Sequence, residues 1–203
     1  MSQTAAAVAS HGEHPAAHTA TGLSMLKLGF WIFLGSETLF FGSLISTYMV
    51  YKHESVVGPY PTEILNIPLT SISTFVLLMS SLAVVIALDA LQRGLRSRAL
   101  FWIMAVVVLG SMFLGFQAYE FTHFYHEGLT LQTNLFGSTF FVLTGFHGAH
   151  VTVGVIWILI LWMDAFRGKL GPANALSFEI AGLYWHFVDI VWIAIFTLIY
   201  LIN

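Results

Sequence analysis

The stretch from Ser177 to Ile202 reads SFEIAGLYWHFVDIVWIAIFTLIYLI and is apolar over almost its whole length. About 20 consecutive apolar residues can cross a bilayer as a helix, so this stretch predicts a membrane span. His186 and Asp189 lie three residues apart near its middle, on one face of the helix. An ionisable group at that depth costs at least about 2.5 kcal/mol and normally faces protein or water. We therefore expect this face to contact other polar groups.

The composition of the whole chain is typical of a membrane protein. Of its 203 residues, 58% are hydrophobic and 8% are charged, against about 25% charged residues in soluble domains. The chain has no cysteine, which excludes disulfides, iron–sulfur clusters and thiolate metal sites. Its seven basic residues and net charge of -3 do not resemble a nucleic-acid-binding surface, so no nucleic-acid partner is expected.

Four further apolar stretches precede the one quoted above. The five predicted spans are residues 26–51, 68–91, 99–124, 134–163 and 178–202. Short connections with glycine and proline separate them, and no linker is long enough to divide two domains. We therefore predict an all-α, polytopic membrane protein, with a single bundle of five transmembrane helices over residues 25–203. Residues 1–24 are rich in small residues, lack the features of a signal peptide and are expected to form a disordered tail.

The basic residues predict the orientation of this bundle. Six of the seven fall on the side of the N-terminus: Lys27, Arg93, Arg96, Arg98, Arg167 and Lys169. Cytoplasmic loops carry an excess of Lys and Arg, so the N-terminus is expected in the cytoplasm and the C-terminus outside. Four tyrosines then fall near the outer interface, where an aromatic belt would place them: Tyr48, Tyr51, Tyr125 and Tyr200.

Glu37 lies within the first span, roughly 16 Å along the helix at 1.5 Å per residue and thus near the midplane. Its neighbours on the helix include Phe33 and Phe41 but no basic residue. Burial without a cationic partner favours the neutral form of a carboxyl group, so we expect Glu37 to be protonated. Two alternatives stay open for it: a hydrogen bond to a neighbouring helix or lipid headgroup, or a proton-carrying site.

Two stripes of small residues predict close contacts between helices. The first span carries Gly29, Ser36, Ser43 and Thr47, and the fourth carries Ser138, Gly145, Ala149 and Thr152. His147 and His150 lie on the opposite face of the fourth span. With His186 they have the spacing to ligate a metal, but neutral imidazoles that bridge helices need no metal. We assign these histidines to helix packing.

The outer end of the third span carries Gln117, Glu120, His123 and Glu127, which predict an interfacial ion pair. The predicted site is an intramembrane polar seam that packs the helices, made of His147, His150, His186, Asp189, Trp185, Glu120 and His123. No set of nucleophile, base and orienting group is present, so no catalytic, cofactor-binding or metal-binding residue is predicted. On residues alone, three classes stay open: a subunit of a larger membrane complex, a small proton-coupled carrier, or an intramembrane metalloprotein. Continuous spans without repeats argue against the carrier.

Four motifs, in order along the chain, resemble subunit III of the haem-copper oxidases and in particular of bacterial cytochrome c oxidase. They are SETLFF at Ser36–Phe41, QAYE at Gln117–Glu120, FGSTFFVLTGFHGAHV at Phe136–Val151 and FEIAGLYWHFVDIVW at Phe178–Trp192. The resemblance covers nearly everything but the tail, and it is to the short five-span form seen in bacteria. The seven-span mitochondrial type has a lipid-filled cleft between its two additional spans and the other five. An equivalent cleft here would need two helices from another chain.

The resemblance implies a non-redox accessory subunit of an aerobic terminal oxidase in the bacterial plasma membrane. That oxidase would couple electron transfer to O2 with proton pumping. Partner subunits would hold haem and copper, with subunit I packed against this chain and subunit II receiving electrons from cytochrome c. Membrane phospholipids would lie against the chain. Glu37 matches the family's midplane carboxyl group, so it would support proton uptake or contact lipid. The alternative within the family is subunit III of a quinol oxidase.

Overall fold

The computed structural model describes residues 24–52, 54, 58 and 65–202. Its helices are α1 (Met25–Tyr51), α3 (Ile67–Gln92), α4 (Arg96–His126), α5 (Leu135–Phe166) and α6 (Ala175–Phe196), with a 3₁₀ turn η1 (Pro172–Asn174) before α6 and a π-helical turn η2 (Thr197–Leu201) after it. The described residues contain five helical segments long and apolar enough to span a membrane, which confirms the predicted fold class. The predicted disordered tail lies, apart from Ser24, outside the described residues.

Local sequence determines where these helices begin and end. Side-chain oxygens cap α1, α3 and α5 by accepting from the backbone amide three residues ahead: Ser24, Asn66 and Asn134. Glycines with positive φ follow the ends of α3, α4 and α5: Gly94, Gly128 and Gly168. Glycine adopts this conformation at low cost because it has no Cβ. The chain can therefore reverse within a few residues between consecutive spans.

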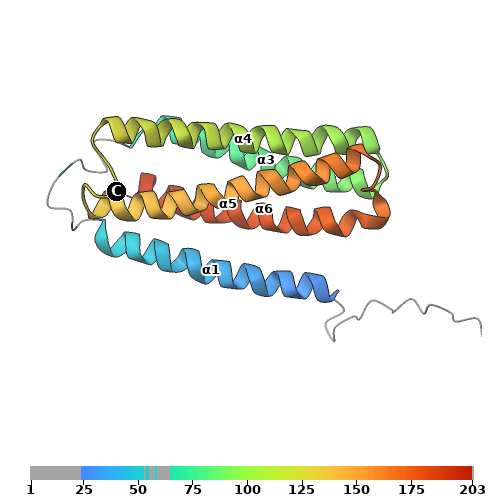
Figure 1. Cartoon of the computed structure of the whole chain (residues 1–203), viewed down its shortest axis with the longest axis horizontal. Coiled ribbons are helices and arrows are strands. Elements are labelled where there is room, and N and C mark those ends of the chain that lie inside the picture. The colour runs from blue at the N-terminus through green and yellow to red at the C-terminus, as the bar shows by residue number, and fades with distance from the viewer. Residues whose placement is uncertain (1–23, 53, 55–57, 59–64, 203) are drawn as a thin grey trace, which may run out of the picture.

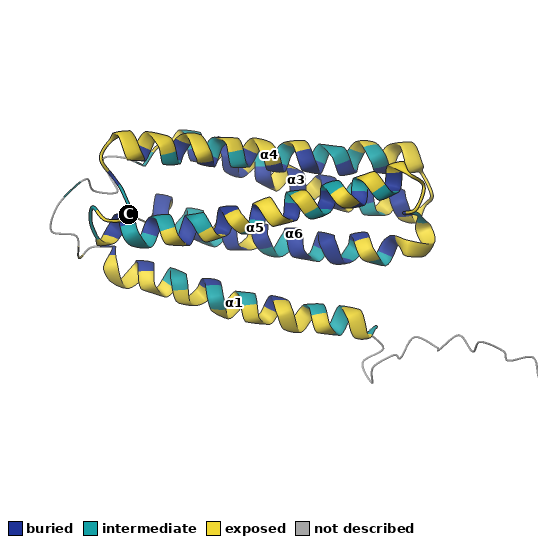
Figure 2. Cartoon of the chain, viewed as in Figure 1, coloured by how far each residue is buried: buried dark blue, intermediate teal, exposed yellow. Residues whose placement is uncertain are grey.

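The helices run side by side, with α3 and α4 packed as one pair and α5 and α6 packed against that pair (Figure 1). Helix α1 lies outside this group, against α5 and α6, and diverges from them toward its N-terminal end (Figure 1). Only Leu34, Phe41 and Tyr48 of α1 are buried. Their seven-residue spacing puts all three on one line along the helix, so the buried surface of α1 is a single narrow stripe (Figure 2). Lys27 near the start of α1 adds an ion pair to Glu179 of α6.

Helix α6 packs between α3 and α5, and glycines of α4 and α5 make room for its Trp185 ring. A Cβ added to Gly110 of α4 would lie 2.6 Å from the Trp185 ring, and one added to Gly154 of α5 would lie 2.9 Å from it. The two small-residue stripes were predicted to allow close helix contacts, and their glycines lie open on the surface of this chain. Cβ atoms added to Gly29 and Gly145, the glycines of those stripes, would meet nothing within 4 Å.

Candidate functional site

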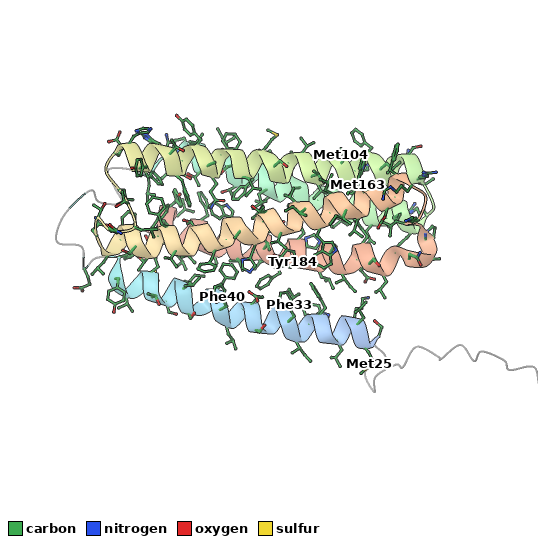
Figure 3. The ribbon with its side chains drawn as sticks, in the orientation of Figure 1. Met25, Phe33, Phe40, Met104, Met163 and Tyr184 are labelled. Atoms are coloured by element: carbon green, nitrogen blue, oxygen red, sulfur yellow. The ribbon has the colours of Figure 1, made fainter. Side chains whose placement is uncertain are left out.

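Glu37 of α1 meets His150 of α5 across the edge of the bundle. Its Oε2 lies 3.2 Å from Nε2 of the imidazole, and about a fifth of each side chain is exposed (19% and 20%). The ring of Phe41 packs edge-on against His150, at 4.9 Å between ring centroids. The hydroxyl of Tyr184 on α6 donates to the backbone oxygen of His150 at 3.0 Å, and Figure 3 labels this tyrosine. Three helices therefore converge on this pair.

The hydrogen bonds of His150 determine where its protons can be. Its Nδ1 lies 2.7 Å from the backbone oxygen of Phe146. A carbonyl oxygen only accepts, so Nδ1 carries hydrogen. Nε2 then either accepts from a protonated Glu37 or, as imidazolium, donates to a Glu37 carboxylate. In both cases one proton lies between the two side chains, and this arrangement needs no redox group.

The basic partner of Glu37 corrects one expectation from the sequence. The neighbours of Glu37 on its own helix include no basic group, but α5 supplies an imidazole from 113 residues further along the chain. The interaction could not be found from helical spacing, which relates only residues of the same helix.

Hydroxyl groups of α3 bind the aromatic side chains of α6. The indole N–H of Trp185 donates to Ser80 and that of Trp192 donates to Thr74, both at 2.9 Å. The Ser81 hydroxyl lies 2.5 Å from Nδ1 of His186. These three α3 residues were not among those predicted from the sequence. The available signal was a run of serine and threonine at helical spacing within an apolar span.

His186 and Asp189 do not pair with each other. His186 contacts Ser81, whereas neither carboxyl oxygen of Asp189 makes a hydrogen bond to any described residue. Ser81 also faces Asp189, but without the geometry of a hydrogen bond. Asp189 is nevertheless buried, with 3% of its surface exposed. Its carboxyl group therefore packs against α3 without fixing the position of His186.

His147 is fully buried and makes contacts of a different kind. Its ring stacks on Trp192 at 4.8 Å between centroids and meets Phe113 edge-on at 5.8 Å. Neither ring nitrogen makes a hydrogen bond to a described residue. His147 and His150 thus face different neighbours although they lie three residues apart. Within the described ranges, no three His, Asp or Glu side chains are grouped so that they could hold a metal ion.

Toward the C-terminal end of α4, Glu120 accepts hydrogen bonds from Thr70 at 2.7 Å and from Tyr200 at 3.1 Å. Glu120 is buried, whereas His123 is exposed and forms no ion pair with it. The predicted interfacial ion pair is therefore wrong.

The tyrosines of the expected aromatic belt differ in their exposure. Tyr48 and Tyr200 are buried inside the protein, so only Tyr51 and Tyr125 of this belt are exposed.

Residues 1–203 match the family described as Cytochrome c oxidase subunit III. The chain is 42% identical to "Quinol oxidase subunit 3" of Bacillus subtilis (strain 168), over 87% of this chain and 86% of that protein. It is also 42% identical to "Cytochrome c oxidase subunit 3" of Bacillus sp. (strain PS3), over 87% of this chain and 85% of that protein. With the five apolar helices, these matches indicate a multi-pass plasma-membrane protein. The chain belongs to the cytochrome c oxidase subunit III family of the haem-copper oxidases.

Proposed function

We propose that this chain is a non-redox accessory subunit that packs against catalytic subunit I and supports proton uptake into it. As a subunit III, it belongs to an oxidoreductase complex whose activity is that of the whole assembly. We assign haem and copper to partner subunits I and II. The observation that carries this role is the Glu37–His150 pair, which shares one proton at the edge of the bundle.

The pair has the properties that a supporting proton site requires. It is partly exposed, so a proton can reach it from a neighbouring subunit or a lipid headgroup. It lies deep in the membrane, where a charge is costly, and sharing one proton between two groups avoids a lone buried charge. Helix α1 buries one stripe of residues and is also joined to α6 by the Lys27–Glu179 ion pair, so the Glu37–His150 contact depends on how α1 packs against the bundle.

The whole oxidase with Glu37→Gln tests this role. The amide cannot exchange a proton, but it preserves the size and polarity of the side chain. We expect O2 reduction to fall by less than about tenfold, which corresponds to 1.4 kcal/mol, and the enzyme to inactivate faster during turnover. Glu127→Gln, at the exposed end of α4, is the matched control and should leave both rates unchanged. Complete loss of turnover in Glu37→Gln would show an essential role and contradict the proposal.

Infrared spectroscopy of the same two variants tests the shared proton. If the proton resides on Glu37, the spectrum contains a carboxylic acid band that disappears in Glu37→Gln and persists in Glu127→Gln. If the spectra show no such band, the proton resides on His150 and the neutral acid expected from the sequence is wrong.

The electron donor is proposed to be cytochrome c, received through subunit II, with quinol as the second candidate. Relatives named for each kind of oxidase are equally similar to this chain, at 42% identity. The purified complex should be assayed with reduced cytochrome c and with a quinol. If the complex reduces O2 with a quinol but not with reduced cytochrome c, the chain belongs to a quinol oxidase.

The N-terminus is proposed to be cytoplasmic because six of the seven basic residues lie at that end of the bundle. The chain has no cysteine, so single substitutions can be labelled without background. Ser97→Cys, at the basic end, should react with an impermeant maleimide only in inverted vesicles. Gln132→Cys, at the opposite end, should react in intact cells. The reverse labelling pattern would show that the N-terminus lies outside the cell and would contradict the proposal.

A further inference from the structure

A groove runs between α4 and α5 on the surface of the bundle. Small residues line it together with Leu114 and Phe121, and Gln117 lies at its floor. We call it the α4–α5 groove, defined by Gln117, Ala118, Gly145, Gly148 and Thr152. A Cβ added to Gly145 would meet nothing within 4 Å, so the backbone of α5 is open to a neighbour there. Small residues on membrane helices allow another helix backbone to approach closely.

The side-chain amide of Gln117 has a hydrogen-bonded nitrogen and an oxygen that receives no hydrogen bond from a described residue. Its Nε2 donates to the backbone oxygen of Thr144 at 2.7 Å. Its Oε1 lies against Gly148, and no described residue donates a hydrogen bond to it. Gln117 is 8% exposed, so neighbouring residues enclose it almost entirely. The oxygen is therefore an acceptor whose position is already determined by the bond that the same amide makes to α5.

The depth of Gln117 makes this free acceptor informative. It lies nine residues before the end of α4 at His126, or about 13 Å along the helix axis. A helix of this length extends beyond the roughly 30 Å hydrocarbon core at both ends, so Gln117 lies within that core. An amide oxygen without a donor costs roughly 1–3 kcal/mol in an apolar environment, and lipid chains have no donor to offer.

Two other surface grooves lack such an acceptor at their floor. The one between α3 and α4 is lined by aliphatic and aromatic side chains and Gly115. The one between α1 and α6 is lined by side chains such as Leu26, Phe30 and Ile180. Acyl chains satisfy such surfaces completely. The α4–α5 groove instead calls for a neighbour that has both a compact backbone and a hydrogen-bond donor.

We propose that a transmembrane helix of another oxidase subunit packs into the α4–α5 groove and donates a hydrogen bond to Oε1 of Gln117. This inference rests on the proposed assembly with the other subunits and names the face at which it occurs. It also accounts for the glutamine of the QAYE motif, which has no part in the proton-sharing pair.

Photo-crosslinking in the whole oxidase identifies the occupant of the groove. A benzophenone amino acid at Ala118 would reach into the α4–α5 groove, whereas one at Tyr119 would face the groove between α3 and α4 at nearly the same depth. We expect the Ala118 probe to form an adduct with another oxidase subunit and the Tyr119 probe to label mainly lipid. At Ala118, an adduct only with lipid, an adduct with a second copy of this chain, or no adduct would each overturn the proposal.

A matched glycine pair measures how much the groove contributes to assembly. Gly145 and Gly115 both have open space at the Cβ position, so a leucine side chain at either begins in open space and not against this chain's own atoms. Leucine also favours a helix more than glycine does. Each variant is first quantified in the membrane and then in the detergent-purified complex. Gly145→Leu should lower the fraction retained with the haem-bearing subunits about tenfold, or 1.4 kcal/mol, and Gly115→Leu should leave it unchanged.

The controls separate the two proposals. If the unaltered chain does not co-purify with a haem-bearing partner, the proposed function fails. If it co-purifies and Gly145→Leu is retained as well as Gly115→Leu, the assembly stands and the α4–α5 groove is not its interface.

Discussion

Helices α1 and α6 both carry ionisable residues at membrane depth, but they are bound to the bundle in opposite ways. Helix α6 buries twelve residues against its neighbours, whereas α1 buries three. The polar residues of α6 bond to neighbouring helices, as His186 does to α3 and Tyr184 does to α5, or are buried without a hydrogen bond to a described residue, as Asp189 is. The polar residue of α1, Glu37, is partly exposed and shares a proton with α5.

Polar groups therefore have two roles in this membrane domain: some hold helices together at its centre, and others lie at its edge where a neighbour can reach them. At the centre, the indole and imidazole groups of α6 meet fixed hydroxyls of α3, and such contacts favour one arrangement of the helices. At the edge, Glu37 and His150 are held less tightly and are open to a neighbour. Ionisable residues of similar depth therefore differ in role because of the number of helices that surround them.

The largest expected effect on stability comes from adding a side chain where the Trp185 ring packs. Gly154→Leu would put side-chain atoms where the Trp185 ring lies, and overpacking costs about 3 kcal/mol or more. We expect loss of the folded subunit from the complex, measured as its thermal dissociation midpoint. Gly42→Leu on α1, where a Cβ meets nothing within 4 Å, is the control. Equal tolerance of both substitutions would contradict the central role of α6.

The second effect tests the single stripe that attaches α1. Phe41→Ala removes the middle of the three buried residues and should weaken attachment of α1 by about 2 kcal/mol, less than in a soluble core because lipid also solvates phenylalanine. Hydrogen exchange should increase throughout α1 and stay unchanged in α6. Leu39→Ala, at an exposed position on the same helix, should have no effect. Faster exchange in α6 as well would show that α1 supports the whole bundle.

A smaller effect is expected from Ser81→Ala, which leaves His186 without its hydroxyl partner. Hydrogen bonds between membrane helices contribute about 0.6 kcal/mol on average and about 1.7 kcal/mol at most. The free energy of unfolding should fall within this range. Ser71→Ala is the control, because Ser71 bonds only to its own helix at Ile67. An effect no larger than that of the control would remove Ser81 from the packing of α6.

The smallest effect is expected at Asp189, whose carboxyl oxygens make no hydrogen bond to described residues. Replacing an unpaired buried polar group by an apolar one of similar shape is nearly neutral. Asp189→Asn and Asp189→Leu should therefore differ in stability by less than about 0.5 kcal/mol. A much larger loss in the leucine variant would show that Asp189 pairs with a group of another subunit.

Hydropathy alone predicts the five spans, because transfer of an apolar segment into lipid depends on its composition and length. It does not predict which faces meet. In a soluble helix, apolar periodicity marks the buried side, but here nearly every face is apolar and the contrast is lost. The stripe containing Gly145 was predicted to allow close helix contact, but the sequence could not show with which neighbour. The structure packs Gly110, Gly148 and Gly154 within the chain and leaves Gly145 open.

The ionisable residues of the candidate site could be predicted from the sequence, but the contacts between them could not. Deep ionisable residues are conspicuous in an apolar sequence, so Glu37, His150 and Asp189 could be singled out. Their partners could not, since contacts between helices depend on the rotation and order of the helices in the bundle. The hydroxyls of α3 were missed for a related reason. Serine and threonine in a membrane helix usually bond to their own backbone, as Ser71 does, so their presence indicates little.

The separation of Glu37 and His150 along the chain has a consequence for synthesis in the membrane. Helices α3 and α4 are consecutive and can pair as soon as both are inserted. Helix α1 precedes them, yet it packs on α5 and α6, and His150 is made 113 residues after Glu37. At about 5–20 residues per second, that interval is roughly 6–23 s. During it the imidazole that meets Glu37 in the folded chain has not yet been made, so α1 cannot complete this contact until α5 follows. Of the five helices, the earliest to be translated is thus among the last to be docked.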